Sequence, residues 1–137
     1  MPDTLRFSSV IPYLFVRDFD RSLHFYCEGF GLRPSSAGVR HLPVRHVQLL
    51  QGELVALMFS PEGALGAAER CPASLGVIAP QTFYLHVSDV DAAYARALAL
   101  GAKVLLEPCN LFWGERLTQL EDLDGYRWAL AQSVAQG

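Results

Sequence analysis

The phrase Tyr13-Leu14-x-Val16-x-Asp18-x-Asp20 occurs twice in this chain, and the second copy is Tyr84-Leu85-x-Val87-x-Asp89-x-Asp91. Five of the eight positions are identical at an offset of 71 residues, about half of the 137-residue chain. In both copies an apolar run meets an acidic residue, and a helix-patterned stretch that ends at a glycine follows. Two copies at so long a period indicate a duplicated half-domain whose halves bury a face against each other.

Length and composition limit the class of protein. With 51% hydrophobic and 18% charged residues, the chain can bury a core and is not a disordered segment. The net charge is −3 and no block of Lys or Arg occurs, so the chain lacks the basic patch expected of a nucleic-acid-binding protein. Neither a membrane-spanning run nor a signal-peptide pattern occurs, and three widely spaced cysteines suit neither a disulfide framework nor a thiolate zinc site. We therefore expect a single cytoplasmic domain over residues 1–137, without nucleic-acid or membrane partners.

The first half, residues 1–60, has the pattern of strand, helix and further strands. Val10–Val16 suits a buried strand, and Asp18 can cap a helix that ends at Gly31. Two strands are expected at Val44–Leu50 and Leu54–Phe59, joined by a tight turn at Gln51-Gly52. Residues 61–80 are rich in Gly, Ala and Pro and form a predicted linker, with a helical turn possible at Ala64–Arg70.

The second half, residues 81–137, repeats this order. The pattern predicts a strand at Thr82–Val87 and a helix at Val90–Leu100, capped by Asp89 and ended by Gly101. A short strand at Lys103–Leu106 is expected to stop before Pro108, and strands at Arg116–Leu120 and Tyr126–Gln132 flank a turn at Leu123-Asp124-Gly125. Each half thus reads as βαβββ, with its last three strands antiparallel because their connections are short.

The ordered motifs resemble a known superfamily. Pro12-Tyr13-Leu14-Phe15-Val16-Arg17-Asp18, Ser22-Leu23-His24-Phe25-Tyr26 and Phe30-Gly31-Leu32 resemble the first module of the vicinal oxygen chelate superfamily, which holds glyoxalase I, extradiol dioxygenases and the bleomycin-resistance proteins. Phe112-Trp113-Gly114-Glu115-Arg116 and Glu121-Asp122-Leu123-Asp124-Gly125-Tyr126-Arg127-Trp128 resemble the end of the second module, especially in the resistance branch. The resemblance implies an α+β fold of two tandem βαβββ modules around an open barrel-like cavity, in a homodimer.

Enzymes of this superfamily hold a divalent metal on four His, Glu or Gln side chains, one from each of four strands. The resemblance places these positions at Ile11, at or near Leu57, at Thr82 and at Ala129. Ile, Leu and Ala offer no lone pair to a cation, and a threonine hydroxyl alone makes no site. The motif frame therefore predicts no metal, no cofactor and no metal-based catalysis. His86 with Glu115 or Glu121 would supply too few ligands for a displaced site.

Strand alternation from Thr82 places Tyr84 and His86 on the cavity face, and in the same way Ile11 places Tyr13 and Phe15 there. His86 is either a packed, hydrogen-bonded histidine or a group that orients a ligand. His41 and His46 are expected on the surface of a hairpin, His24 and Tyr26 are expected to divide between solvent and core, and Trp128 is expected in the core.

The segment at the predicted strand Arg116–Leu120 carries two further candidates. Trp113 either closes the end of the barrel or stacks over a ligand as a lid, as the resistance branch implies. Arg116 either pairs with Glu115 or Asp122, or contacts an anionic group. No local nucleophile–base motif occurs, Asp122 and Asp124 suit a turn, and Glu121 is at most a lone general base.

The predicted function is metal-free sequestration of a planar or aromatic small molecule, for example an antibiotic, in a cavity at a dimer interface. The predicted ligand-binding residues are Tyr13, Phe15, Tyr84, His86, Trp113 and Arg116, and no catalytic residue is predicted. One alternative is a metal-dependent lyase, isomerase or dioxygenase with displaced ligands. The other is a structural or regulatory dimer whose cavity is filled.

Overall fold

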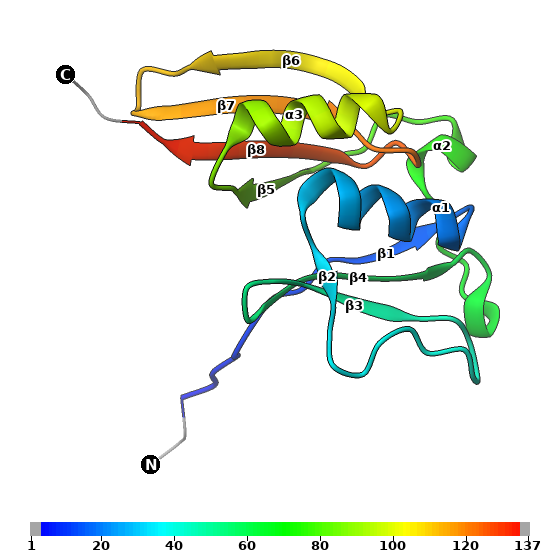
Figure 1. Cartoon of the computed structure of the whole chain (residues 1–137). Coiled ribbons are helices and arrows are strands. Elements are labelled where there is room, and N and C mark those ends of the chain that lie inside the picture. The colour runs from blue at the N-terminus through cyan, green and yellow to red at the C-terminus, as the bar shows by residue number, and fades with distance from the viewer. Residues whose placement is uncertain (1–3, 135–137) are drawn as a thin grey trace.

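Two four-stranded sheets, each covered by a helix, make up the structure (Figure 1), a computed structural model that describes residues 4–134. The strand order is β1-β4-β3-β2 in the first sheet and β5-β8-β7-β6 in the second. The bounds are β1 Tyr13–Val16, β2 Arg33–Pro34, β3 Val47–Gln51, β4 Leu54–Pro61, β5 Thr82–His86, β6 Lys103–Asn110, β7 Glu115–Glu121 and β8 Arg127–Ser133. The helices are α1 Phe19–His24, α2 Pro72–Leu75 and α3 Val90–Ala99, with a 3₁₀ turn at Ala64–Gly66.

The repeat seen in the sequence is also a repeat of strand register. Tyr13 of β1 lies opposite Met58 of β4, and Tyr84 of β5 lies opposite Ala129 of β8, both in parallel pairs. Both members of the second pair are 71 residues beyond those of the first (84 − 13 and 129 − 58). The last three strands of each half are antiparallel. The predicted α+β fold of two tandem βαβββ modules is therefore confirmed, and the two sheets do not join into a closed barrel.

The two capping aspartates start the two longer helical segments. The Asp18 side chain accepts the backbone N–H of Arg21 at 3.1 Å, and the Asp89 side chain accepts that of Ala92 at 3.0 Å. Each bond satisfies a donor that the first helical turn leaves unpaired. The helix α1 is shorter than predicted, because it continues as a π-helical turn over Phe25–Gly29.

Two local expectations were wrong, and one was confirmed in part. The strand β6 does not stop before Pro108 but runs to Asn110, with an irregular register between Leu106 and Cys109. It is the edge strand of its sheet, where a missing N–H and a bulge are tolerated. The helical turn expected in the linker at Ala64–Arg70 is present as the 3₁₀ turn at Ala64–Gly66, and the linker also has a short α-helix at Pro72–Leu75, where proline occupies the first helical position. The first strand begins at Tyr13, three residues later than expected.

The helices α1 and α3 pack against the two sheets and share one core. Phe25, Tyr26 and Phe30 of the first module pack with Trp128 and Leu130 of the second in a single buried cluster. Figure 1 shows α1 and α3 side by side. Gly29 lies at this contact, where an added Cβ would stand 3.4 Å from the Leu100 side chain and 3.6 Å from the Ala97 Cα, in ordinary van der Waals contact. The predicted core position of Trp128 is confirmed, with 2% of its surface exposed.

The turn between β7 and β8 is organised around the buried carboxylate of Asp122. Its Oδ1 accepts the backbone N–H groups of Asp124 and Tyr126, both at 3.0 Å. Its Oδ2 accepts Trp128 Nε1–H at 2.9 Å and the hydroxyl of Tyr26, which belongs to the first module. Four donors from two modules therefore converge on a single side chain that is 7% exposed.

Two other residues of the same turn bond to the segment from β1 to α1. Asp124 accepts the backbone N–H of Arg17 at 3.1 Å, its Nε at 3.0 Å and the Ser22 hydroxyl at 3.0 Å. The Tyr126 hydroxyl accepts the Phe15 N–H at 3.2 Å and donates to the Phe15 carbonyl at 2.9 Å. From the sequence, Asp122 and Asp124 were expected only to form the turn. In the structure, this turn is also the main polar link between the modules.

We predict that Asp122→Ala lowers the free energy of unfolding by about 3 kcal/mol or more, because it leaves buried donors without an acceptor. Chemical denaturation measures this loss. Glu69→Ala is the control, since its side chain is exposed and makes no hydrogen bond within residues 4–134, and it should change stability by less than about 0.5 kcal/mol. Equal losses in the two variants would contradict the role given to Asp122.

The same carboxyl gives a pH-dependent contribution. Burial raises the pKa of Asp122 from 3.8 to about 6, against the opposing effect of its hydrogen bonds. Between these two values the folded chain holds a proton that the unfolded chain releases, so this contribution to stability falls as pH rises from about 4 to about 6. The expected size is about 3 kcal/mol, from roughly two pKa units.

Denaturation of wild type and Asp122→Asn at several pH values isolates the contribution of the Asp122 carboxyl to stability, because the amide does not titrate. The difference in stability between the two proteins should change across this pH window in the stated direction. A difference that stays constant from pH 4 to pH 7 would contradict the raised pKa.

Candidate functional site

A cleft of about 490 Å³ lies between β5 and the start of β4, within the size range of small-molecule sites. From β5 it is lined by Thr82, Tyr84 and His86, and the opposite wall comes from residues 54–56 of β4. Val10 and Pro12, before β1, also line it, and Phe83, Leu85 and Trp128 contribute from the core side. At one end the side chain of Gln51, the last residue of β3, donates to the His86 carbonyl at 2.5 Å, which ties the two modules together across the cleft.

The exposed ends of β5 and β7 carry a hydrogen-bonded cluster centred on Glu115. Its Oε1 accepts the Tyr84 hydroxyl at 2.5 Å and Trp113 Nε1–H at 2.7 Å, and its Oε2 lies 3.0 Å from His86 Nε2. These bonds, that of Tyr84 first, lower the pKa of the Glu115 carboxyl, and the bond to Glu115 raises the pKa of the Tyr84 phenol. The carboxylate thereby fixes the orientation of two aromatic rings and an imidazole.

Three of the predicted ligand-binding residues therefore come together. The strand alternation predicted for β5 is confirmed, since Thr82, Tyr84 and His86 are exposed while Leu85 is buried. About half of the surface of Tyr84 and of Trp113 is exposed. From the sequence, Glu115 was expected only as a metal ligand in too small a set or as a partner for Arg116. The alternation Trp113-x-Glu115 ahead of a strand was the signal that could have placed it beside Trp113.

Tyr13 and Phe15 form a separate cluster on the first module. The Tyr13 ring stacks on His46 at 5.6 Å and contacts Phe15 at 5.2 Å. The Tyr13 hydroxyl lies 2.6 Å from Ser60 Oγ, which lies 3.4 Å from His46 Nδ1. The prediction that His46 is a surface residue was wrong, because it packs on Tyr13 and is partly buried. His41 is exposed as predicted. Neither Tyr13 nor Phe15 lines the cleft at β5.

Arg116 does not join the cluster around Glu115. It follows Glu115 on β7 and therefore points to the opposite, helix-covered face of the sheet. There its guanidinium pairs with Asp91 of α3 at 2.7 and 2.9 Å and donates to Asn110 at 3.0 Å. These contacts connect α3 to the edge of the sheet, and neither of the partners proposed from sequence, Glu115 or Asp122, is used.

The strands give the four family metal positions a definite orientation. Leu57 is fully buried in the core on the helix side, so the position at or near it must be the neighbouring Met58, which matches Ala129 in the repeat register. Ala129 is buried beside Leu117 and Ala131. Ile11, Met58, Thr82 and Ala129 together offer one hydroxyl and one thioether, a donor set that does not fit a hard divalent metal.

The other polar side chains that the structure describes offer neither a metal site nor an accessible catalytic group. No group of three or more His, Cys, Asp or Glu side chains within residues 4–134 is arranged to hold a metal ion. Glu121 is paired with Arg127 at 3.0 Å. Ser60 and His46 form a contact that the sequence had not indicated, but Ser60 is fully buried and no substrate can reach its hydroxyl.

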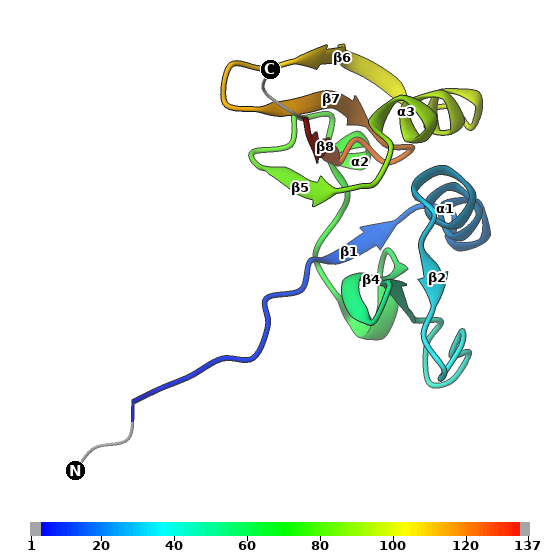
Figure 2. The same ribbon diagram turned by 60° about the vertical axis from the view of Figure 1, so that its left-hand side comes forward.

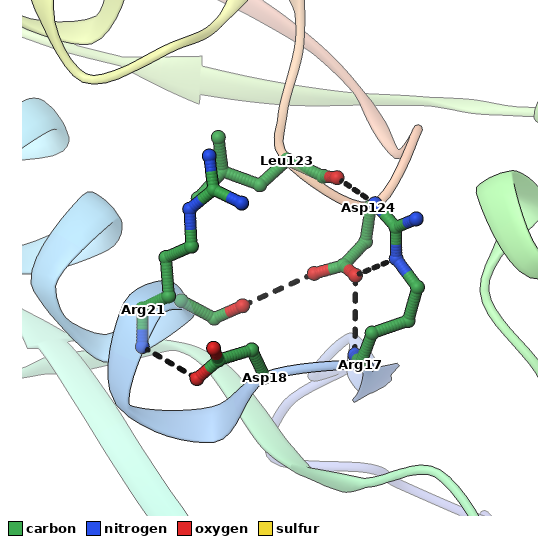
Figure 3. Close-up of a pocket in the computed structure, with 6 residues that line it drawn as sticks. Arg17, Asp18, Arg21, Leu123 and Asp124 are labelled. Carbon is green, nitrogen blue, oxygen red and sulfur yellow. Dashed lines mark hydrogen bonds and ion pairs between the residues drawn. The ribbon is translucent and has the colours of Figure 1, made fainter.

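A smaller cavity of about 240 Å³ lies beside the module link (Figure 3). Its walls include Arg17, Asp18, Arg21 and Asp124, so their formal charges balance. Asp124 is used by Arg17 and Ser22, and Asp18 caps α1. The bond to Asp124 raises the pKa of Arg17, which keeps this pair ionised. We assign this cavity to the link between the modules and not to a ligand.

Comparison with known proteins agrees with this architecture. The family model for the glyoxalase/bleomycin resistance protein/dioxygenase superfamily matches residues 6–130. An uncharacterized protein of Mycobacterium bovis, Mb0911c, is 33% identical over 131 residues, which cover 91% of this chain and 83% of the relative. The chain belongs to the glyoxalase/bleomycin resistance protein/dioxygenase superfamily.

Solved structures of low sequence identity share the fold. TioX from Micromonospora sp. ML1 aligns with a TM-score of 0.67 at 24% identity over 95% of this chain and 99% of TioX. A glyoxalase family protein from Bacillus cereus aligns with a TM-score of 0.75 at 16% identity over 98% and 99%. The fosfomycin resistance protein FosX of Listeria monocytogenes, solved as a mutant with Mn(II) and a dihydroxypropylphosphonic acid, aligns with a TM-score of 0.68 at 16% identity over 91% and 90%.

Within residues 4–134, no helix combines the length and the apolar character that crossing a membrane requires.

We predict that Glu115→Ala releases the Trp113 indole while the fold persists. The chain has two tryptophans, so two indole N–H signals are expected in a ¹H–¹⁵N spectrum. The Trp113 signal should shift and its N–H should exchange faster with water, because its acceptor is gone, while the buried Trp128 signal should stay in place. The matched variant Glu121→Ala removes a carboxylate that bonds Arg127 and should leave both signals unchanged. An unmoved Trp113 signal in Glu115→Ala would contradict the cluster.

Proposed function

We propose that this protein is a cytoplasmic binding protein that sequesters a planar or aromatic small molecule in the β5 cleft, without a metal. The observation that carries this proposal is the cleft of about 490 Å³ with the half-exposed Tyr84 on its wall and the cluster around Glu115 at its edge. Sequestration needs affinity alone, and a cleft with aromatic surface and a few polar groups can supply it.

The side chains at the cleft suit such a ligand. Tyr84 offers ring surface for stacking, and burying it against a planar compound gives both area burial and the additional energy of an aromatic pair. Trp113 is held by Glu115 next to Tyr84, so it can close over a compound that enters along β5. His86 has a 69% exposed side chain whose ring is oriented by Glu115, and it is the proposed polar anchor.

We further propose that a second copy of the chain completes the site in a homodimer. The segment before β1 leads away from the body of the molecule in both views (Figure 2). Its large apolar side chains are exposed, at 96% for Leu5, 81% for Phe7 and 83% for Val10. Val10 also lines the cleft, so a copy that covers this segment would also enclose the ligand. In such a dimer the exposed Tyr13 would face the partner or its ligand, whereas Phe15 is buried beneath it.

The family is consistent with this proposal, since its name includes bleomycin resistance proteins and FosX is a fosfomycin resistance protein. An antibiotic is therefore one candidate ligand class. The second candidate function is a metal-dependent lyase, isomerase or dioxygenase with displaced ligands, and the approach of His86 to Glu115 at 3.0 Å favours it. These two side chains alone would leave most of a coordination sphere to other groups.

The proposal predicts that planar compounds quench the fluorescence of Trp113. A panel of naphthalene, quinoline and acridine derivatives is titrated into wild type, Trp113→Phe and Tyr84→Ala. Binding should quench wild type, the response should be lost in Trp113→Phe, and Tyr84→Ala should bind about tenfold or more weakly because a stacking wall is gone. Trp128 also lines the cleft but is only 2% exposed, so Trp128→Phe measures its share of the quenching, and most of the response should remain in this variant.

If none of these compounds binds the protein, the result would instead favour a structural or regulatory dimer whose cavity is filled. Binding that is unchanged in both Tyr84→Ala and Trp113→Phe would place the site elsewhere.

Metal analysis separates sequestration from the enzymatic candidate. After purification without chelators, the proposal predicts far less than one equivalent of Ni, Zn, Fe or Mn per chain and ligand binding that EDTA does not change. About one equivalent, lost together with ligand binding or turnover after chelation and in His86→Ala, would establish the metal-dependent alternative.

A further inference from the structure

The first module carries a second cavity, of about 330 Å³, that the β5 cleft does not include. It lies between the loop after β2 and the start of β3, where Arg40 and His46 pair through their backbones at 2.8 and 2.9 Å. Its lining consists of Ser35, Ala37, Gly38, Arg40, His46 and Gln48.

The charge of this lining has one sign. No carboxylate is among the lining residues, while one guanidinium and one imidazole are. Within residues 4–134, Arg40 forms no ion pair, unlike Arg17, Arg45, Arg116 and Arg127. Arg40 is also close enough to His46 to contribute, after burial, to lowering the pKa of the imidazole. Two positive or potentially positive groups thus share one cavity without a counter-charge.

The cavity also holds a polar group without a partner. Ser35 Oγ is buried and makes no hydrogen bond within residues 4–134. A buried hydroxyl normally finds a partner, since leaving it unpaired costs stability. The backbone of the same loop is already satisfied, because the Ser35 N–H donates to the Gln48 carbonyl and the Gly38 N–H to the Ser35 carbonyl. Ser35 therefore places an unpaired hydroxyl donor at the wall of the cavity.

The contacts behind His46 prepare its other nitrogen to donate. Nδ1 lies 3.4 Å from Ser60 Oγ, which lies 2.6 Å from the Tyr13 hydroxyl. When Tyr13 donates to Ser60 and Ser60 donates to Nδ1, the proton of a neutral imidazole sits on Nε2. This arrangement holds the ring through its Nδ1 side and leaves an Nε2–H donor, and protonation of the ring only adds charge.

We propose that this cavity binds the oxyanion group of a small molecule, a phosphate, sulfate or carboxylate, through Arg40, His46 and Ser35. A guanidinium presents paired N–H donors that match two oxygens of such a group, and charge-assisted bonds of this kind are the strong ones. The volume exceeds that of the anion alone, so Ala37, Gly38 and Gln48 would contact the group attached to it. The site is independent of the β5 cleft and does not rest on the function proposed for it.

The test follows the imidazole of His46 by NMR while sodium sulfate or sodium acetate is added, with sodium chloride at the same ionic strength as the reference. Sulfate stays fully ionised over the range in which histidine titrates. An anion beside the ring favours its charged form, so sulfate should raise the pKa of His46 relative to chloride. The NMR signals of the exposed His24 and His41 serve as the internal reference and should not respond to sulfate beyond the chloride control. If sulfate shifts the pKa of His46 and acetate does not, the cavity is a site for a tetrahedral anion. If acetate shifts it, the cavity is a site for a carboxylate.

Variants distinguish a built site from general surface charge. Arg40→Gln should weaken anion binding by about tenfold or more, and Ser35→Ala should weaken it severalfold. Arg33→Gln makes the same change of charge on β2, outside the cavity lining, and should bind like wild type. The proposal is overturned if neither anion shifts His46 beyond the chloride reference. It is equally overturned if Arg33→Gln loses as much binding as Arg40→Gln.

Discussion

The buried carboxylate of Asp122 is the constraint on which the relative position of the two modules depends. It accepts donors from its own turn and from Trp128, and it also accepts the hydroxyl of Tyr26 in the first module. A buried charge is tolerated only when its hydrogen bonds are complete, so these groups must keep their places together. Asp124 and Tyr126 extend the same turn to Arg17 and to Phe15. The cleft depends on this link, because its walls come from β4 of one module and β5 of the other.

The two modules share a register but have different side chains on their exposed faces. Position 13 and position 84 are both tyrosines, yet Tyr13 bonds to Ser60 and stacks on His46, whereas Tyr84 bonds to Glu115. The second module combines its tyrosine with an indole and an imidazole around a carboxylate, and the first combines its tyrosine with an imidazole next to a basic cavity. The same duplicated frame therefore contributes an aromatic wall to the cleft from the second module, while the first module carries the cavity lined by Arg40 and His46 that we propose as an oxyanion site.

Much of the fold could be predicted from the chain because its signals are local. The repeated phrase, the aspartate caps and the helix-ending glycines depend on neighbouring residues, and the structure confirms them. The strand that begins at Lys103 was predicted to stop before Pro108, but it continues because it lies at the edge of its sheet. An edge position is a property of the whole sheet and is not visible in the local sequence. Leu57 was off by one residue from the inward-facing Met58, because a motif frame without strand register does not resolve alternate faces.

The candidate site was predicted in part for the same reason. Alternation along β5 correctly grouped Tyr84 with His86, but Arg116 follows Glu115 on β7 and therefore lies on the other face, where it pairs with Asp91. Apart from Trp113, the partners of Glu115 come from β5, and His46 stacks on Tyr13 of β1. No local pattern indicates such distant pairs. Asp122 and Asp124 show the same limit, because turn chemistry explains their residue type but not their bonds to Tyr26 and Arg17.

A crystal structure of the protein with a planar compound that quenches its fluorescence tests the central claim most directly. The account predicts the compound in the β5 cleft, stacked on Tyr84, in contact with His86 and covered by Trp113, with no metal ion among its contacts. A compound bound away from β5, or a metal ion that His86 and Glu115 coordinate together with the ligand, would contradict it.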